Sequence, residues 1–157
     1  MEKLNQGDKI PYFEVKNQDG EVVTSDSFAG KHVILYFYPK DNTPGCTLEA
    51  QNMRDGKQAL VDAGFEIFGI SPDSDESHRN FCKKHDLNFT LLSDPDKKAA
   101  EAFGVWGEKK MYGRTVMGIK RTTFIIAPDG TIEKIFAKVD TKNHYQQILE
   151  WYNASAK

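Results

Sequence analysis

Cysteine is scarce in this sequence: its 157 residues include only two, Cys46 and Cys82. Two cysteines cannot build a disulfide framework, and no Cys-x-x-Cys pair suggests a zinc ribbon or a dithiol reductase. A chain of this length buries roughly 70% of its unfolded surface and needs no cross-link or structural metal to be stable. In a reducing compartment, such cysteines are more often catalytic, metal-binding or inert than structural.

The sequence also lacks long apolar runs and an excess of charge of either sign. No apolar segment approaches the ~20 residues of a membrane span. The 21 basic and 23 acidic residues give a formal net charge of −2, which leaves no basic footprint for nucleic acid. The segment from Met1 to Asp8 has no apolar stretch like that of a signal peptide. We therefore expect a cytoplasmic protein that binds neither membranes nor nucleic acid.

The composition that remains is ordinary for a globular protein. Hydrophobic residues make up 39% of the chain and charged residues 28%, a balance that argues against disorder. No internal repeat, linker or low-complexity tract divides the sequence. We therefore expect a single domain over residues 1–157.

Hydrophobic patterning predicts strands that alternate with helices. Two short strands joined at Asp19-Gly20 are typical of a hairpin near the N-terminus. Continuous apolar runs, typical of strands buried on both faces, follow at 32–38, 65–71 and 89–92. Helices are predicted from Thr43 towards Gly64 (with Gly56 as a weak point), and at 73–86, 96–103 and 140–152; a second hairpin is predicted at 121–127 and 131–136.

This order of elements predicts the fold class. Strands that alternate with helices imply parallel β-α-β units, and a strand pair before the last helix implies an antiparallel edge. We therefore expect an α/β protein with a thioredoxin-like fold, in which helices flank a central mixed β-sheet that carries an N-terminal β-hairpin. Such a fold does not by itself establish a function.

The segment from Pro39 to Glu49 is the most informative, because it joins a buried strand to the start of a helix. With Thr43 at the helix cap and Pro44 at the first position, Cys46 falls in the first helical turn. Unpaired N–H groups and the positive end of the helix dipole favour a thiolate there. Gly45 allows a substrate to approach the backbone closely. The alternative interpretation is an inert cysteine buried near a helix start.

A reactive thiolate needs a partner for the charge that develops during reaction. Arg121 is a candidate, because it begins the predicted strand at 121–127 and a charge that enters a buried strand is usually paired or functional. A surface arginine at a strand end is the equally open alternative.

The Pro39…Thr43-Pro44-Gly45-Cys46 element resembles the peroxidatic motif of the peroxiredoxins. Its form, Thr-Pro-Gly-Cys-Thr-x-Glu, is similar to that of the bacterioferritin-comigratory, or Q-type, subgroup. The resemblance covers nearly the whole chain, and four further segments match in the expected order: 69–73, 91–94, 103–110 and 118–124.

The resemblance implies a thiol peroxidase for hydrogen peroxide and small organic hydroperoxides, with no metal, haem, flavin or other cofactor. Cys46 would attack the peroxide O–O bond and become a sulfenic acid. Thr43 would hydrogen-bond the peroxide, Arg121 would steady the thiolate and polarise the leaving oxygen, and Pro39 would shield the thiol. A thioredoxin-like dithiol is the implied reductant, and a monomer is the implied assembly.

The sequence departs from a common pattern of the subgroup at Gln51, where many members carry a second, resolving cysteine. Other members place that cysteine on the following helix, and Cys82 matches this variant. The resemblance thus implies an intramolecular disulfide between Cys46 and Cys82. The alternatives are that Cys82 fills the core beside Phe81 and that Cys46 works alone.

Other interpretations remain open at this stage. His78, Cys82 and His85 share one helix face and would offer three metal ligands. A Gly-rich stretch, surrounded by Trp106, Tyr112 and Met117, would form an apolar collar over the site, a piece of ordinary core or a mobile surface loop. For function, the alternatives are a disulfide reductase, which the missing Cys-x-x-Cys argues against, and a non-catalytic thioredoxin-like binding module.

Overall fold

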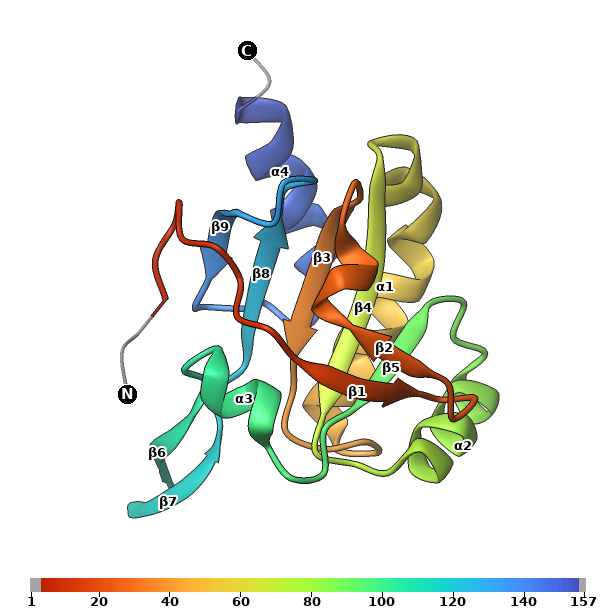
Figure 1. Ribbon diagram of the computed structural model, residues 1–157. Helices are drawn as coiled ribbons and strands as arrows, with labels where there is room; N and C mark the ends of the chain where they lie inside the picture. The colour runs from red at the N-terminus through yellow and green to blue at the C-terminus, as the bar shows by residue number, and fades with distance from the viewer. Residues whose placement is uncertain (1–3, 156–157) are drawn as a thin grey trace.

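A seven-stranded β-sheet forms the centre of the structure, a computed structural model that describes residues 4–155 (Figure 1). Its strands lie in the order β2-β1-β5-β4-β3-β8-β9. They are β1 (Glu14–Asn17), β2 (Val22–Thr24), β3 (His32–Phe37), β4 (Phe65–Ser71), β5 (Thr90–Ser93), β8 (Thr122–Ile126) and β9 (Ile132–Phe136). The helices are η1 (Ser25–Phe28), α1 (Pro44–Asp62), α2 (Asp75–His85), α3 (Lys98–Ala102) and α4 (His144–Ser155).

The sheet is mixed, as the order of elements predicts. β3, β4 and β5 run parallel to one another, whereas β8 and β9 extend the sheet antiparallel to β3. At the other edge, β1 pairs antiparallel with both β2 and β5. The predicted N-terminal hairpin is therefore confirmed, and it belongs to the central sheet.

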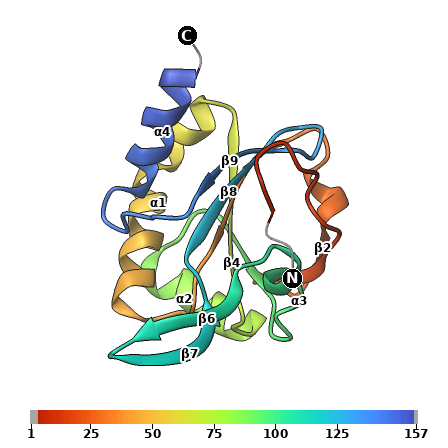
Figure 2. The same cartoon turned by 90° about the vertical axis from the view of Figure 1, so that its left-hand side faces the viewer.

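Two hydrophobic clusters cover the two faces of the sheet, and strand β3 contributes alternate residues to each. Val33, Leu35 and Phe37 pack on the face covered by η1 and α3. Ile34, Tyr36 and Tyr38 pack on the face covered by α1, α2 and α4. Figure 2 shows α1 and α4 on one side of the sheet and α3 on the other. This layering confirms the predicted α/β architecture. A short loop then joins the end of β3 at Phe37 to the start of α1 at Pro44.

Helix α1 is continuous through Gly56, contrary to the weak point that we predicted there. A Cβ atom at this glycine would lie 2.1 Å from the ring of Tyr145 on α4. The missing side chain therefore lets α4 pack closely against α1, and the aromatic contact compensates for the low helix propensity of glycine.

The helix boundaries near Asp94 and Asp140 differ from the prediction. Helix α3 begins at Lys98, where the Asp94 carboxylate accepts hydrogen bonds from the N–H groups of Ala99 and Ala100. Helix α4 begins only at His144, because Asp140 accepts from the N–H of Lys142 and so stabilises a turn before the helix. Aspartate stabilises turns as readily as helix caps, which explains the error at α4.

The Gly-rich stretch that follows α3 forms a separate two-stranded sheet, β6 (Trp106–Met111) and β7 (Arg114–Ile119). Tyr112 and Gly113 form its turn with φ values of 52° and 76°, the positive values of a type I′ turn. Trp106 packs against the core, but Tyr112 is 98% exposed and Met117 is 54% exposed. The apolar collar considered above is therefore not formed by these side chains.

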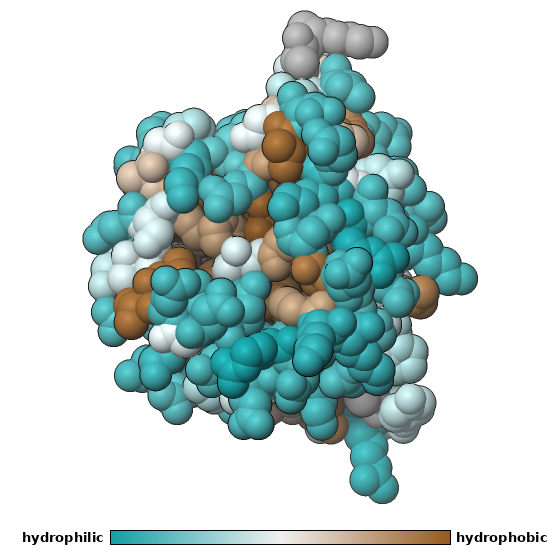
Figure 3. Space-filling model, turned by 90° about the vertical axis from the view of Figure 1, so that its right-hand side faces the viewer, coloured by the Kyte–Doolittle hydropathy of each residue, from teal (hydrophilic) through white to brown (hydrophobic). Residues whose placement is uncertain are grey.

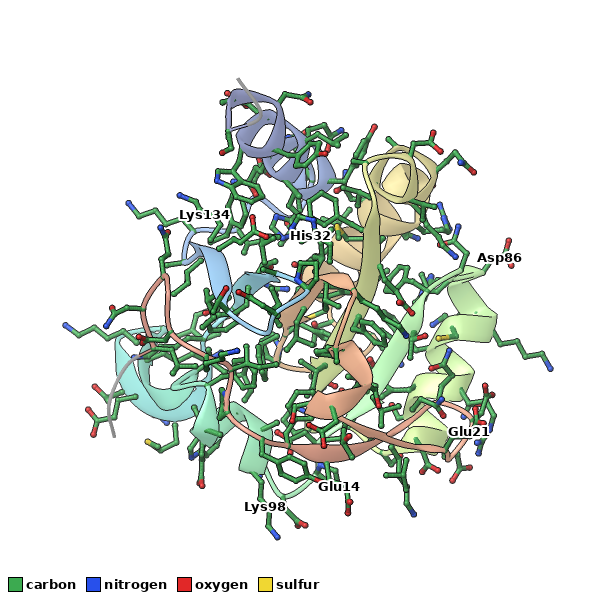
Figure 4. The ribbon with its side chains drawn as sticks, turned by 45° about the horizontal axis from the view of Figure 1, so that its top comes forward. Glu14, Glu21, His32, Asp86, Lys98 and Lys134 are labelled. Carbon is green, nitrogen blue, oxygen red and sulfur yellow. The ribbon has the colours of Figure 1, made fainter. Side chains whose placement is uncertain are left out.

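The outer surface is largely hydrophilic. On the side of α1 and α2, hydrophobic atoms show only in patches among hydrophilic ones (Figure 3). Glu14, Glu21, Asp86, Lys98 and Lys134 lie at the periphery, away from the packed interior (Figure 4). Across residues 4–155, no helix has the length and apolar character needed to cross a membrane.

Candidate active site

Cys46 lies in the first turn of α1, as predicted from the sequence. Thr43 is the N-cap with extended backbone angles, and Pro44 is the first helical residue. The N–H groups in such a first turn have no partner within the helix and point towards its N-terminal end. The Cys46 side chain is only 1% exposed and packs against the hydrophobic cluster under α1. The thiol thus sits at the positive end of the helix in a site that largely excludes water.

Arg121 reaches the Cys46 thiol from the sheet, whereas Cys46 itself lies on α1. It directly precedes β8, whose Thr122 is paired with Phe37 at the end of β3. This register places the guanidinium beside the start of α1, where Nη2 donates to Sγ of Cys46 at 3.3 Å. A Cβ atom on Gly45 would lie 3.2 Å from the same Nη2, so glycine leaves room for this approach.

Thr43 and Pro39 complete the loop around the thiol. The Thr43 hydroxyl donates to the carbonyl oxygen of Lys40 at 2.9 Å. Because its single proton is used in that bond, the hydroxyl oxygen is free to accept a hydrogen bond from an incoming O–H group. Pro39 is half-buried after the end of β3, where its ring fixes the backbone that leads to the loop.

Glu49 is a site residue to which we assigned no role from the sequence. It lies on α1 one turn beyond Cys46 and is fully buried. Its Oε1 accepts from Nη1 of Arg121 at 2.6 Å. Glu49 and the Cys46 sulfur therefore hold two nitrogens of the same guanidinium, a fixed geometry that the planar fork of arginine suits.

The second oxygen of Glu49 faces His144, which α4 brings into the same layer. Across residues 4–155, Glu49 Oε2 has no hydrogen-bond partner, and it lies 3.9 Å from Nε2 of His144. His144 Nδ1 donates to Gln147 Oε1 at 2.9 Å, and its Nε2 accepts from the hydroxyl of Thr123 at 2.8 Å. The imidazole is therefore a neutral ring whose Nε2 lone pair accepts from Thr123.

Burial governs the ionisation of this cluster. Burial raises the pKa of Glu49 to about 7, although Arg121 opposes the shift. It lowers the pKa of His144 to about 4, partly offset by the bond to Gln147. For Arg121, burial disfavours the charge, but Glu49 and Cys46 outweigh it and raise the pKa. The guanidinium thus remains the fixed positive charge at the thiol.

We expect the stability of Glu49→Gln relative to wild type to increase as the pH rises from 5 to 8. The folded pKa of Glu49 is about 7, against 4.5 for the ordinary group. Ionisation therefore opposes folding increasingly across this window, whereas glutamine cannot ionise and still accepts from Arg121. Urea unfolding at pH 5, 6, 7 and 8 measures the difference, with the exposed Glu150→Gln as control. A difference that stays constant with pH contradicts the prediction.

Cys82 and Cys46 form no disulfide, and both are free thiols. It is half-buried in the third turn of α2 and packs against the same hydrophobic cluster as Cys46. Burial, with smaller contributions from Asp41 and Asp19, raises the pKa of Cys82 to about 11. In this position the thiol stays protonated and is a poor nucleophile.

The metal-binding interpretation of helix α2 is not supported. Within residues 4–155, the ligand atoms of His78, Cys82 and His85 do not converge. The atoms that do converge belong to Asp41, Asp73 and His78, and hydrogen bonds within the protein already occupy them.

Comparison with known proteins gives a consistent picture. The AhpC/TSA family is matched over residues 6–135. A relative named Peroxiredoxin Bcp, from Escherichia coli, is 46% identical over 156 residues, which cover 99% of this chain and 100% of that protein.

Solved structures from Xanthomonas campestris share the architecture. Two cysteine-to-serine mutants of its peroxiredoxin Q are 39% and 38% identical to this chain, with TM-scores of 0.85 and 0.84, covering 92% and 91% of both chains. A third structure is of a bacterioferritin comigratory protein and is described by its alkyl peroxide reduction activity. It is 36% identical to this chain with a TM-score of 0.86, and the match covers 96% of this chain and 100% of that one. These likenesses confirm the thioredoxin-like fold.

Proposed function

This chain belongs to the AhpC/TSA family and is a peroxiredoxin, a thiol-dependent peroxidase, and we propose that Cys46 is its peroxidatic cysteine. The observation that carries the proposal is the 3.3 Å contact between Arg121 Nη2 and the Cys46 sulfur at the start of α1. It joins a helix N-terminus and a fixed cation on one thiol, the combination that favours a thiolate.

In the first step, the Cys46 thiolate attacks one peroxide oxygen, forming an S–O bond as the O–O bond breaks. The products are a sulfenic acid and a hydroxide or alkoxide, which takes up a proton from the buffered solvent and leaves as water or an alcohol. Arg121 is placed to stabilise the oxygen that leaves. The free lone pair on the Thr43 hydroxyl can accept a hydrogen bond from the peroxide hydroxyl, and Pro39 shields the thiol. No residue of this step requires a cofactor or metal. Hydrogen peroxide and organic hydroperoxides both fit this chemistry.

In the second step, Cys82 acts as the resolving cysteine. Its thiolate attacks the sulfur of the Cys46 sulfenic acid, so that an S–S bond forms and hydroxide leaves. Cys82 follows Cys46 by 36 residues, and the two Xanthomonas campestris mutants carry serine at two cysteine positions with the same separation. Cys46 and Cys82 lie on different helices and are not bridged. Since a disulfide needs Cα atoms roughly 4.4–6.8 Å apart, we propose that the first turn of α1 and the region around Cys82 open locally before the bond forms.

A dithiol reductant then restores both thiols by disulfide exchange. We assign this role to a thioredoxin-like protein, and we assign the enzyme to the cytoplasm as a monomer. The low cysteine count and the need for a dithiol reductant support the assignment to a reducing compartment.

The experiment that tests this scheme is treatment with one equivalent of peroxide, followed by peptide mapping. We expect a Cys46–Cys82 cross-link within one chain, and we expect Cys82→Ser to over-oxidise Cys46 to sulfinic acid more readily. The Gln58→Ala variant is the matched control and should cross-link normally, because this exposed side chain on α1 bonds Asp62 on the same helix. If wild type retains a free Cys82 thiol after oxidation, Cys46 works alone.

A further inference from the structure

A buried group of polar side chains links the loop that leads into α1 and Cys46, here called the Cys46 loop, to the helix that carries Cys82. Asp41 lies on that loop, and His78 lies on α2, four residues before Cys82 and so one helical turn away. His78 Nδ1 and Asp41 Oδ2 are 2.8 Å apart, and both side chains are almost completely buried. Ser77 Oγ donates to the same carboxylate at 2.8 Å. We call these three residues, Asp41, Ser77 and His78, the Asp41 clamp.

The protons of the clamp can be counted from its partners. His78 Nε2 lies 2.8 Å from the carbonyl oxygen of Leu92, which only accepts, so Nε2 carries a proton. Asp41 Oδ1 accepts from the hydroxyl of Tyr38 at 2.6 Å. Asp41 thus takes part in hydrogen bonds with Tyr38, Ser77 and His78 together. Hydrogen bonds to an ionised partner are about twice as strong as neutral ones.

Helix α2 has few buried residues. Of the eleven residues from Asp75 to His85, only His78 and Phe81 are buried. Phe81 contributes an apolar contact. Polar contacts come from the clamp, from Arg54, which donates to the carbonyl oxygen of His85, and from Arg79, which donates to the carbonyl oxygen of Gln18. Of these polar contacts, the bond between His78 and Asp41 is the fully buried one, and it lies one turn before Cys82. Its loss should therefore loosen the helix around that thiol.

We propose that His78, through Asp41, is a positioning residue that holds α2 against the Cys46 loop and thereby sets the rate at which Cys82 forms the disulfide. The inference rests on the resolving role proposed for Cys82. It predicts that a weaker clamp opens α2 more often, speeds disulfide formation and shortens the time for which the sulfenic acid is exposed to over-oxidation. The attack of Cys46 on peroxide, which takes place in the closed form, is unaffected.

The closed clamp also suppresses the reactivity of Cys82. Burial and the nearby Asp41 charge raise the pKa of its thiol to about 11. Opening moves Cys82 into water and away from that charge, where thiols ionise near pH 8.5. Movement and activation of the resolving thiol therefore occur in the same event.

The first test measures opening without peroxide. In a Cys46→Ser background, Cys82 is the only thiol, and its alkylation by N-ethylmaleimide reports how often α2 opens. We expect Asp41→Asn to speed alkylation about tenfold, because asparagine replaces a charge-assisted bond with a neutral one. Asp94→Asn is the matched control, since it makes the same change at a carboxylate that is equally buried but caps α3. Equal acceleration by both variants overturns the proposal, because it reveals only a loss of global stability.

A second variant removes one bond of the clamp and keeps its charge. Ser77→Ala should speed alkylation about threefold, the effect of one neutral hydrogen bond. If Asp41→Asn does not fold, the alkylation rate of Ser77→Ala tests the proposal in its place. If Asp41→Asn accelerates alkylation and Ser77→Ala does not, the Asp41 charge acts on the thiol directly and the clamp is refuted.

The last test uses the chain with both cysteines. After one equivalent of peroxide, acid quenching and mass spectrometry follow the sulfenic acid and the disulfide separately. We expect Asp41→Asn to speed disulfide formation about tenfold and to change the peroxide step less than twofold. A slower peroxide step with unchanged disulfide formation contradicts the clamp. If no Cys46–Cys82 disulfide forms in any variant, the resolving role fails, whereas the alkylation result still stands on its own.

Discussion

Cys46→Ser is expected to abolish peroxide reduction while the protein still folds. Attack on the O–O bond requires a thiolate, and a serine hydroxyl in the same place is not ionised at pH 7. The substitution replaces one buried sulfur with a smaller oxygen that Arg121 can still contact, so the packing under α1 should change little. Peroxide consumption coupled to thioredoxin oxidation measures the loss.

The control for this prediction is Cys82→Ser, which removes the other sulfur. With dithiothreitol as reductant, Cys82→Ser should still consume peroxide, because a small thiol can reduce the Cys46 sulfenic acid directly. Turnover of Cys46→Ser at the wild-type rate would refute the assignment of the peroxidatic cysteine. A wild-type protein with no turnover would favour a non-catalytic thioredoxin-like module instead.

The parts of the site that follow directly from local sequence were predictable. Thr43, Pro44 and Cys46 lie within one helical turn, so the cap position and the proline at its start suffice to place the thiol. Arg121 was predictable as a candidate because a charge at the start of an apolar strand stands out. Its contact with Cys46 depends on the pairing of β8 with β3, which no local pattern specifies.

The positions of Glu49 and His144 in the site could not be predicted from the sequence. Glu49 follows Cys46 by three residues, and this helical spacing was the available signal for a shared face. A glutamate on a helix is nonetheless usually exposed, and only the packing of α4 and β8 against α1 buries it. His144 joins the site from a helix that begins almost a hundred residues later. Such long-range convergence is set by the fold as a whole.

The fold was predicted better in its core than at its margins. Continuous apolar runs identified β3, β4 and β5 because burial on both faces leaves an unmistakable pattern. The hairpin of β6 and β7 was missed because its strands are mostly exposed and alternate weakly. Gly56 was misread as a weakness, because its value lies in the contact with Tyr145.

Arg121→Ala is expected to slow peroxide reduction by about 10²-fold or more, the scale of one lost transition-state donor. The variant loses the hydrogen bond to the Cys46 sulfur and the positive charge that meets the leaving oxygen. It also leaves the buried Glu49 without its cation. We therefore expect a smaller thiolate fraction at pH 7 as well as a slower step once the thiolate has formed.

Two measurements separate these effects. The pH dependence of iodoacetamide alkylation, in a Cys82→Ser background, reports the thiolate fraction of Cys46, and stopped-flow kinetics report the peroxide step. Lys120→Ala removes the neighbouring exposed cation and should leave both quantities unchanged. Arg121→Lys should recover part of the thiolate fraction but less of the rate of peroxide reduction. A single ammonium cannot hold Glu49 and the Cys46 sulfur at once in the fixed geometry of the guanidinium fork. If neither quantity changes in Arg121→Ala, Arg121 is only a charge at the start of a strand.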